Sequence, residues 1–363
     1  MKITSLSLNN FRNYKQAEVR WNDKLNIICG MNAQGKSNLL EAICYLSLSN
    51  SFRGATDSDI LAYGADFFRL SGQIENREIK SELVVAYSKG RKIWKIDGQN
   101  KRKVSEIVGC FYTIIFSPED LSLVKSGPDT RRKFFNRQMA QLYPDFYVLL
   151  LRYNKTLKQR NSLLRMEKIT DEELLPWEDQ LAQLSAQIVK RRIEMLKLLT
   201  PNIAKVHNTL NKDEILTIEY KGILPEKQLE KLSLSELKKV YLANYFRLKR
   251  AERARMMTLS GPHRDDFIIK INQMPAKNFA SQGQQRSAAL ALKLGEMELA
   301  YTERGYYPVL LLDDVMSEFD ILRREQLLTM INGKSQTFIT ATDLNFQLFD
   351  GQKFVIEKGI IKQ

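Results

Sequence analysis

Residues 30–37 read Gly-Met-Asn-Ala-Gln-Gly-Lys-Ser, a glycine-rich segment that ends in a lysine and a serine. Their order matches the pattern G-x-x-x-x-G-K-[ST], whose glycines let successive backbone N–H groups point at one phosphate. The apolar residues 25–29 precede the segment, and a helix-like stretch follows it. A strand, a glycine loop and a helix N-terminus in this order favour phosphate binding. We therefore expect Lys36 to contact the β- and γ-phosphates of a nucleotide and Ser37 to bind Mg²⁺.

A second chemical feature is a pair of carboxylates, Asp313 and Asp314, directly after the apolar residues 309–312. Four consecutive apolar residues are typical of a strand that is covered on both faces. Ligands of open α/β sheets bind at the carboxyl ends of such strands. We expect Asp313 to hold Mg²⁺, directly or through water, and Asp314 to orient or deprotonate the attacking water.

A third feature, Ser281-Gln-Gly-Gln-Gln-Arg, precedes an apolar helix-like stretch. A Ser and a Gly at a helix N-terminus form a second anion-binding end, and one triphosphate seldom needs two such ends. We interpret Ser281 as serving the nucleotide of a partner subunit. The alternative is an ordinary helix N-cap, which the segment read by itself fits equally well.

These residues require strands and helices to position them. Short β-like runs occupy residues 3–8, 25–29, 83–87, 93–96 and 113–116, and they return at 267–271, 308–312 and 337–339. Between them, residues 129–200 and 235–255 have helical periodicity, which Pro144, Pro176 and Pro201 divide into separate helices. We expect an α/β fold interrupted by an all-helical insertion. The predicted domains are residues 1–120, 121–257 and 258–363, the first and third forming one ATPase body.

Several of these segments resemble motifs of the ABC ATPase superfamily. Residues 279–286, Phe-Ala-Ser-Gln-Gly-Gln-Gln-Arg, resemble its signature motif LSGGQQR, from which Ala280 and Gln282 depart. Residues 317–320, Ser-Glu-Phe-Asp, resemble its D-loop. Residues 10–14, Asn-Phe-Arg-Asn-Tyr, resemble the nucleotide-contacting N-terminal element of the Rad50 and SMC branch. The motifs and this resemblance together imply nucleotide contacts at Gly30, Met31, Asn32, Ala33, Gln34, Gly35, Lys36, Ser37, Asn38, Arg12, Asn13, Ser281, Gly283, Gln284, Asp320 and Thr342.

Residues 116–147, 260–266 and 281–296 extend the resemblance to a family of bacterial recombination mediators within that branch. The resemblance covers the whole chain. It implies a weak, DNA-stimulated ATPase that dimerises with ATP and binds gapped DNA or junctions between single-stranded and double-stranded DNA. It also implies RecO and RecR as partners in loading RecA, together with roles in replication-fork recovery and SOS induction.

Two departures from the superfamily pattern predict slow hydrolysis. Asp314 stands where most members have Glu, and its carboxylate is about one methylene shorter. Thr342 stands where a histidine is usual, and a threonine hydroxyl donates a hydrogen bond but carries no positive charge. No glutamine-loop residue is evident, and Ser117 and Glu119 lie about where one is expected.

The charge of the chain favours a polyanionic partner. In 363 residues, 56 Lys and Arg stand against 42 Asp and Glu, a net charge of +14. A charge of this size favours nucleic acid, although it also serves solubility alone. The candidate DNA contacts are Arg131, Arg132, Lys133 and Arg137, for which a solvated helix face is an equal alternative. We expect the adjacent Phe134 and Phe135 to be core residues.

The three cysteines, Cys29, Cys44 and Cys110, have no disulfide or metal-site spacing and favour small buried side chains in a reducing compartment. The first residues lack the apolar stretch of a secretory signal, and no segment approaches the ~18 apolar residues of a membrane span. The sequence therefore predicts a cytoplasmic protein without a membrane partner.

Alternative functions fit the motifs less well. A nuclease of the overcoming-lysogenization-defect type would carry an acidic metal domain after the ATPase motifs, and the chain ends soon after Asp343. A small-molecule kinase would have an arginine-rich lid and no signature motif. A transporter ATPase keeps two glycines where this chain has Gln282-Gly283, and it lacks the long helical insertion.

Overall fold

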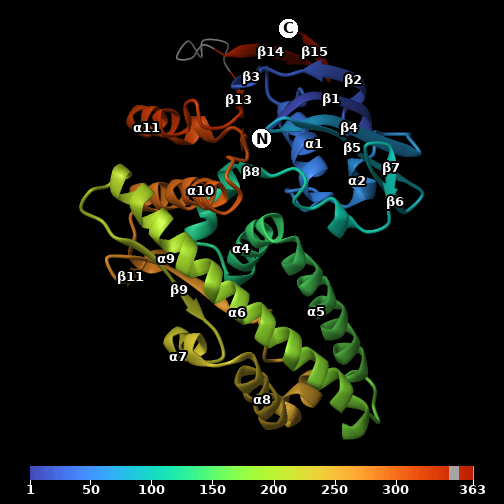
Figure 1. Cartoon of the computed structure of the whole chain (residues 1–363), viewed down its shortest axis with the longest axis vertical. Helices are drawn as coiled ribbons and strands as arrows, with labels where there is room; N and C mark the ends of the chain where they lie inside the picture. The colour runs from blue at the N-terminus through green and yellow to red at the C-terminus, as the bar shows by residue number, and fades with distance from the viewer. Residues whose placement is uncertain (343–350, 363) are drawn as a thin grey trace. The chain divides into compact units, whose positions relative to one another are not determined.

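The computed structural model describes residues 1–342 and 351–362, so Asp343 lies outside the described residues. The chain forms two compact units. We call Met1–Ser122 with Ala289–Gln363 the α/β unit, and Leu123–Ala288 the helical unit. Their elements are labelled in Figure 1.

The α/β unit contains two six-stranded sheets. The first is antiparallel, in the order β2-β1-β4-β5-β6-β7. Its strands are β1 (Lys2–Phe11), β2 (Tyr14–Arg20), β4 (Phe67–Asn76), β5 (Ile79–Ser88), β6 (Arg91–Ile96) and β7 (Gln99–Lys101). The second has the order β15-β14-β3-β13-β12-β8 and is parallel except for the β14–β15 pair. Its strands are β3 (Leu25–Cys29), β8 (Thr113–Phe116), β12 (Val309–Leu312), β13 (Thr337–Ala341), β14 (Gln352–Glu357) and β15 (Ile360–Lys362).

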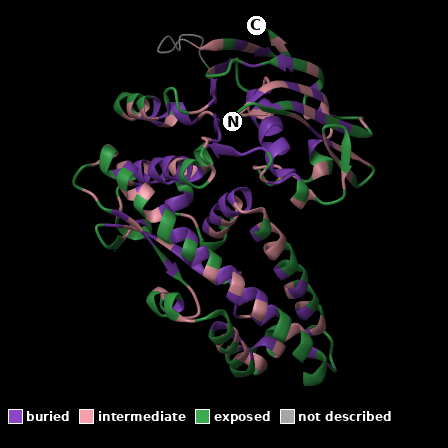
Figure 2. Ribbon diagram, viewed as in Figure 1, coloured by how far each residue is buried: buried purple, intermediate pink, exposed green. Residues whose placement is uncertain are grey.

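Helix α1 (Lys36–Leu48) lies between these sheets and packs against strands of both. Leu39, Leu40 and Ile43 of α1 are fully buried, and they join apolar side chains of β1, β4 and β12 in one core. Figure 2 shows α1 buried along almost its whole length. Because both its faces are covered, α1 lacks a polar stripe, and its N-terminus is fixed at the carboxyl end of β3. The other helical segments of the unit are α2 (Asp57–Ile60), η1 (Val104–Glu106), α3 (Pro118–Leu121), η3 (Val315–Glu318) and α11 (Ile321–Ile331).

The helical unit is built on one long helix, α6 (Asp171–Leu210), against which α5 (Pro144–Leu163) and α8 (Leu234–Arg255) pack. A small antiparallel sheet has the order β11-β10-β9. The remaining elements are η2 (Ser122–Val124), α4 (Pro128–Leu142), β9 (Leu216–Lys221), α7 (Glu226–Lys231), β10 (Asp266–Ile271), β11 (Met274–Pro275) and α9 (Ala276–Phe279). Helix α10 (Gln282–Arg304) begins in this unit and continues into the α/β unit.

The mixed α/β architecture with a largely helical second unit confirms the predicted fold class. Strands β3 and β8 have the predicted bounds, and Phe134 and Phe135 are buried as expected. Two hairpin turns, Lys89-Gly90 and Asp97-Gly98, join β5 to β6 and β6 to β7 with positive φ at all four residues. Such turns match the twist of the strands that they connect.

Three sequence predictions are wrong. Pro176 and Pro201 lie inside α6 and do not end it, although an interior proline costs about 3 kcal/mol. Burial of the apolar face of α6 against its neighbours offsets that cost. The predicted insertion, residues 121–257, is also not all-helical, because it contains β9. Finally, Cys110 is exposed, whereas Cys29 and Cys44 are buried.

The divisions of the chain also differ from the predicted boundaries. The structure divides it after Ser122 and after Ala288, where the sequence suggests 120 and 257. The second division comes later because β10 pairs with β9 along its whole length and so holds the following residues in the helical unit. In residues 1–342 and 351–362, none of the helices is both long and apolar enough to cross a membrane.

Candidate nucleotide site

The loop between β3 and α1 is folded around the side chain of Lys36. The Lys36 ammonium donates to the backbone oxygens of Gly30, at 2.8 Å, and Met31, at 3.2 Å. Gly30 has a φ of 152°, and a Cβ there would lie 2.6 Å from the carbonyl oxygen of Ile356. Both the positive φ and the short distance to Ile356 therefore exclude a side chain at residue 30. Lys36 is buried, and its ammonium lies against the backbone of the loop that the sequence predicts to bind a phosphate.

Asn13, in the turn between β1 and β2, makes hydrogen bonds that hold this loop. Its side-chain nitrogen donates to the backbone oxygen of Gln34 at 2.9 Å, and its side-chain oxygen accepts from Asn38 at 2.9 Å. From the other side, the backbone N–H of Lys358 donates to Oε1 of Gln34 at 2.6 Å. These contacts to Asn13, Asn38 and Lys358 fix the shape of the loop, and a loop that is already ordered loses less conformational entropy when it binds a ligand.

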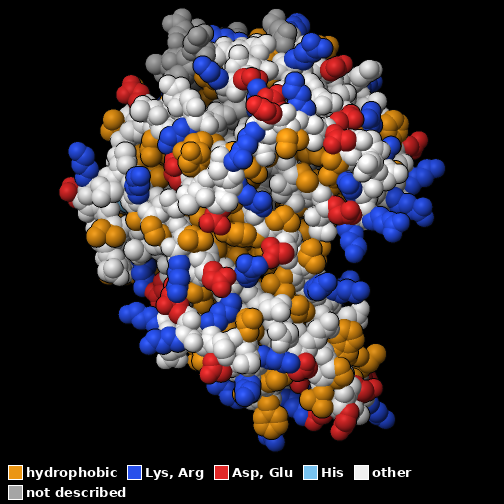
Figure 3. All heavy atoms as spheres, viewed as in Figure 1, with side chains coloured by type: hydrophobic (Ala, Val, Ile, Leu, Met, Phe, Trp, Pro, Cys, Tyr) orange, Lys and Arg blue, Asp and Glu red, His pale blue; other side chains and the backbone are white. Residues whose placement is uncertain are grey.

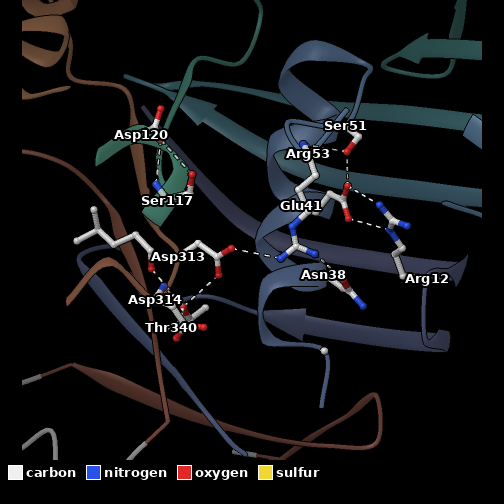
Figure 4. A network of polar contacts seen from close by, with 12 residues as sticks. Arg12, Asn38, Glu41, Ser51, Arg53, Ser117, Asp120, Asp313, Asp314 and Thr340 are labelled. Carbon is white, nitrogen blue, oxygen red and sulfur yellow. Dashed lines mark hydrogen bonds and ion pairs between the residues drawn. The ribbon is translucent and has the colours of Figure 1, made fainter. Parts of the chain in front are cut away.

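The acidic residues lie at the end of β12, next to the start of α1 (Figure 4). Asp313 is 5% exposed, and the nearby Ser37 hydroxyl and Arg53 guanidinium both stabilise its charged form. The structure therefore brings together Ser37 and Asp313, the two residues that the sequence predicts to hold Mg²⁺. Burial raises the pKa of Asp313, and the Asp314 carboxylate adds to that shift, while Ser37 and Arg53 oppose it.

Asp314 is held by a residue that sequence reasoning did not assign to the site, Thr340 on β13. The Thr340 hydroxyl accepts from the backbone N–H of Asp314 at 2.7 Å, and it lies 3.2 Å from Oδ1 of Asp313. Asp314 itself has a φ of 51°, a left-handed conformation that turns the chain sharply after the strand. Thr340 thus joins both carboxylates to the neighbouring strand.

Arg12 makes an internal ion pair that the sequence did not predict. Its Nε and Nη2 atoms each donate to the Glu41 carboxylate at 2.8 Å. Glu41 is fully buried in α1 and also accepts from the Ser51 hydroxyl (Figure 4). Such a two-point pair fixes the guanidinium in orientation. A nucleotide contact by Arg12 would therefore use the remaining Nη1 edge, which here donates to the backbone oxygen of Asp59 at 2.8 Å.

The signature segment, residues 279–286, lies in the helical unit at the start of α10. The Ser281 hydroxyl accepts from the backbone N–H of Gln284 at 3.2 Å, and the Gln284 side chain accepts from the backbone N–H of Ser281 at 2.8 Å. This reciprocal pair is a capping arrangement, so the alternative reading of Ser281 as an N-cap describes its contacts within this chain. Ser281 is exposed, and Gly283 is half-buried.

Glu214, in the loop after α6, contacts the signature segment through the side chain of Gln284. It accepts from Nε2 of Gln284 at 2.8 Å and from the side chain of Asn211 at 3.1 Å, and it lies 2.9 Å from Nε2 of His207. Burial opposes ionisation of Glu214, but these hydrogen bonds lower its pKa below the usual value. Seventy residues separate Glu214 from Gln284, so no local sequence pattern indicates their contact.

The remaining predicted nucleotide contacts occupy element ends in the α/β unit. Asp320 caps α11 by accepting from the backbone N–H of Arg323 at 2.9 Å, and Thr342 is an exposed residue directly after β13. At the end of β8, Ser117 donates to Asp120, which also pairs with Lys293 at 2.9 Å. The structure thus places a polar cluster, without a glutamine, where the sequence suggests the glutamine loop.

One of the candidate DNA contacts needs correction. The Arg131 guanidinium is buried and donates to both carboxylate oxygens of Asp266, at 2.8 and 2.7 Å, so it belongs to the core. Arg132 donates to the backbone oxygen of Asp265 at 2.6 Å. Lys133 is exposed and pairs with Asp129 on its own helix at 2.7 Å, and Arg137 is half-buried.

Comparisons with known proteins agree with this geometry. Residues 2–353 match the family model described as RecF/RecN/SMC N terminal domain. The chain is 39% identical over 350 residues to the DNA replication and repair protein RecF of Bacillus cereus (strain B4264), covering 95% of this chain and 93% of that one. It superposes on a structure of the recombination mediator protein RecF-ATPrS in the RecFOR pathway, with a TM-score of 0.93 and 35% identity over 99% of this chain and 97% of that one. A Smc head bound to the C-winged helix domain of ScpA shares the fold, with a TM-score of 0.56 and 14% identity over 100% of this chain and 97% of that one.

A phosphate-binding loop after β3 and a double carboxylate after β12, two parallel strands of one sheet with β13 between them, combine with a signature segment at a helix start. Together they define an ATPase head of the ABC type. The matches at this identity and coverage go further than that class. The chain belongs to the RecF family.

Proposed function

We propose that this chain is an ATP-dependent DNA-binding protein of recombinational repair and replication, which dimerises with ATP and hydrolyses it slowly. In this proposal, nucleotide state controls a clamp of two copies on single-stranded, double-stranded or gapped DNA. The observation that carries it is the position of the Asp313 carboxylate at the end of β12, beside the start of α1 and a loop shaped around Lys36.

Within one copy, the residues of this site have separate tasks. Lys36 and the backbone N–H groups of residues 30–37 bind the phosphates, while Asn13 and Asn38 keep the loop in place. The Ser37 hydroxyl and the Asp313 carboxylate are hard oxygen donors and fit Mg²⁺. When bound, Mg²⁺ neutralises charge on the β- and γ-phosphates. Asp314 orients the attacking water and accepts its proton.

The second half of the site comes from another copy of the chain. Ser281 is exposed at the N-terminus of the 23-residue helix α10, where the helix dipole and free N–H groups favour an anion. In the proposed dimer, Ser281, Gly283 and Gln284 of one copy contact the γ-phosphate held by the other, while Asp320 and Thr342 contribute near the same phosphate. ATP then links two copies, and its hydrolysis releases them.

Slow turnover follows from the residues at the reacting end of the site. Asp314 is a short carboxylate fixed by Thr340, and Thr342 supplies no positive charge to the γ-phosphate. Weak acid–base catalysis suits a switch, because slow hydrolysis prolongs the lifetime of the ATP-bound dimer. We expect gapped DNA to stimulate turnover by favouring the dimer.

The partners proposed here follow from family membership and charge. The RecF relative is named as a DNA replication and repair protein, and the solved relative is placed in the RecFOR pathway. We propose that the chain acts with RecR and RecO to help load RecA. We also propose that it contributes to SOS induction and acts in the cytoplasm.

ATP turnover on three substrates tests this function: no DNA, blunt duplex, and duplex with a single-stranded gap. We expect slow turnover without DNA and faster turnover with gapped DNA, and loss of both in Asp314→Asn. Fast turnover without DNA, unchanged by the gapped substrate, would contradict the proposal.

A further inference from the structure

The positive charge of the chain is concentrated in one of its two units. The helical unit, residues 123–288, holds 31 Lys and Arg against 18 Asp and Glu, a net charge of +13 out of the +14 of the whole chain. The α/β unit is almost neutral, with 25 basic and 24 acidic residues. Figure 3 shows Lys and Arg side chains spread over much of the visible surface. A polyanion therefore finds its net attraction in the helical unit.

Within that unit, the second half of α8 presents a face without exposed acid. From residue 241 to residue 257 the only acidic residue is Glu252, which is fully buried and paired with Arg160 at 2.6 Å. Two of the basic residues on this half-helix, Lys249 and Arg253, share one acidic partner, Asp171 at the start of α6. Arg247 and Arg250 are exposed and pair with no acid among the described residues.

An exposed aromatic side chain lies between these cations. Phe246 is 79% exposed, on the same face as Arg250 one turn further along the helix and beside Arg247 in sequence. The ring is left open to solvent even though Leu242 and Ala243 lie one turn earlier on the helix. Beyond the end of the helix, Met257 is 39% exposed, and the Arg264 guanidinium lies 3.6 Å from its sulfur.

We propose that this face, made of Phe246, Arg247, Arg250, Met257 and Arg264, binds single-stranded DNA. The arginines contact phosphates, and the Phe246 ring stacks on an unpaired base. A duplex offers phosphates but no free base face, so the exposed ring favours the single strand. This inference rests on the proposed DNA-binding function and deepens it by naming the surface and the strand.

Fluorescence anisotropy of the full chain on labelled oligonucleotides tests the surface. The variants are the double substitution Arg247→Ala with Arg250→Ala, and the single substitution Phe246→Leu. The matched control is Lys80→Ala with Arg91→Ala, which removes the same charge from exposed strands of the nearly neutral α/β unit. Thermal unfolding verifies that each variant folds.

We expect the double variant to lose single-strand affinity and to flatten the plot of log affinity against log salt by about 1.4, at ~0.7 per lost phosphate contact. Phe246→Leu should lower single-strand affinity by about 5- to 100-fold and leave duplex affinity unchanged. Equal losses on both DNA forms with no effect of Phe246→Leu would overturn the single-strand assignment, and so would losses as large in the control. If the wild-type chain binds no DNA at all, the proposed function itself fails.

Discussion

The Arg53 guanidinium lies 3.3 Å from Oδ2 of Asp313, the carboxylate proposed to hold Mg²⁺. Arg53 also donates to Oδ1 of Asn38, 3.2 Å away (Figure 4), and its guanidinium lies over the Phe52 ring. The Arg53 guanidinium thus pairs with a buried carboxylate. We propose that Arg53 and Mg²⁺ compete for Asp313, and that the guanidinium moves when the metal ion binds.

Arg53→Ala tests this competition. Without the guanidinium, Mg²⁺ meets no resident cation at Asp313, and we expect half-maximal ATP turnover at a lower Mg²⁺ concentration than in the wild type. A titration of turnover against Mg²⁺ at fixed ATP measures the shift. A higher Mg²⁺ requirement would show instead that Arg53 assists the nucleotide complex.

Lys36→Met should remove most of the affinity for ATP. The methionine keeps much of the side-chain length but has no charge to offer the phosphates, and hydrogen bonds to charged groups contribute about 1.5–3 kcal/mol. We expect at least a 10-fold rise in the Kd for ATP, measured by calorimetry. The control is Lys24→Met, an exposed lysine just before β3 in the same unit. An unchanged Kd in Lys36→Met would contradict the proposal that this loop binds the phosphates of ATP.

The pH dependence of stability should show two opposing groups in the helical unit. Burial lowers the pKa of His263 to about 4, so between pH 4 and 6.5 the unfolded chain binds the proton and stability rises with pH. Burial raises the pKa of Asp265 to about 6, so between pH 4 and 6 the folded chain holds the proton and stability falls as pH rises. The two contributions are of similar size, about 3 kcal/mol each, and opposite sign.

Single variants separate these contributions. Urea unfolding from pH 4 to pH 6.5 should give a free energy that rises more steeply with pH in Asp265→Asn than in the wild type. In His263→Asn it should rise less steeply or fall. Parallel curves for wild type and both variants would mean that neither group changes its protonation on unfolding.

Glu214 should affect the partnership between copies without affecting nucleotide binding to one copy. Glu214→Ala removes the acceptor of Gln284 and leaves the signature segment less ordered, which we expect to weaken ATP-dependent dimerisation about 10-fold. Glu214→Gln should restore part of it, and the matched control Glu219→Ala on β9 should leave it unchanged. Sedimentation with ATP measures dimerisation, and loss of ATP affinity in Glu214→Ala would contradict a role confined to the signature segment.

The parts of the site that sequence could predict are those encoded in short contiguous segments. The loop around Lys36 and the carboxylates after β12 follow from residue types and spacing, because each segment alone fixes its own turn and strand end. Helix α6 could not be predicted in full, since Pro176 and Pro201 stop a helix locally and only packing against α5 and α8 overrides them.

The side chains that orient the site were beyond sequence reasoning. Arg53, Thr340 and Glu214 belong to no motif, and each meets its partner across 260, 26 and 70 residues of chain respectively. Arg131 shows the opposite error. Its basic cluster suggests a surface, but its pairing with Asp266, 135 residues away, buries it.

The mass of the complex on a short gapped duplex, measured by light scattering with ATP and then with ADP, tests the central claim most directly. The account predicts two copies per DNA with ATP and fewer with ADP, and it predicts that Ser281→Arg abolishes the two-copy complex while binding ATP normally. One copy under both nucleotides, or an unchanged two-copy complex in Ser281→Arg, would contradict the completion of the site by a second copy.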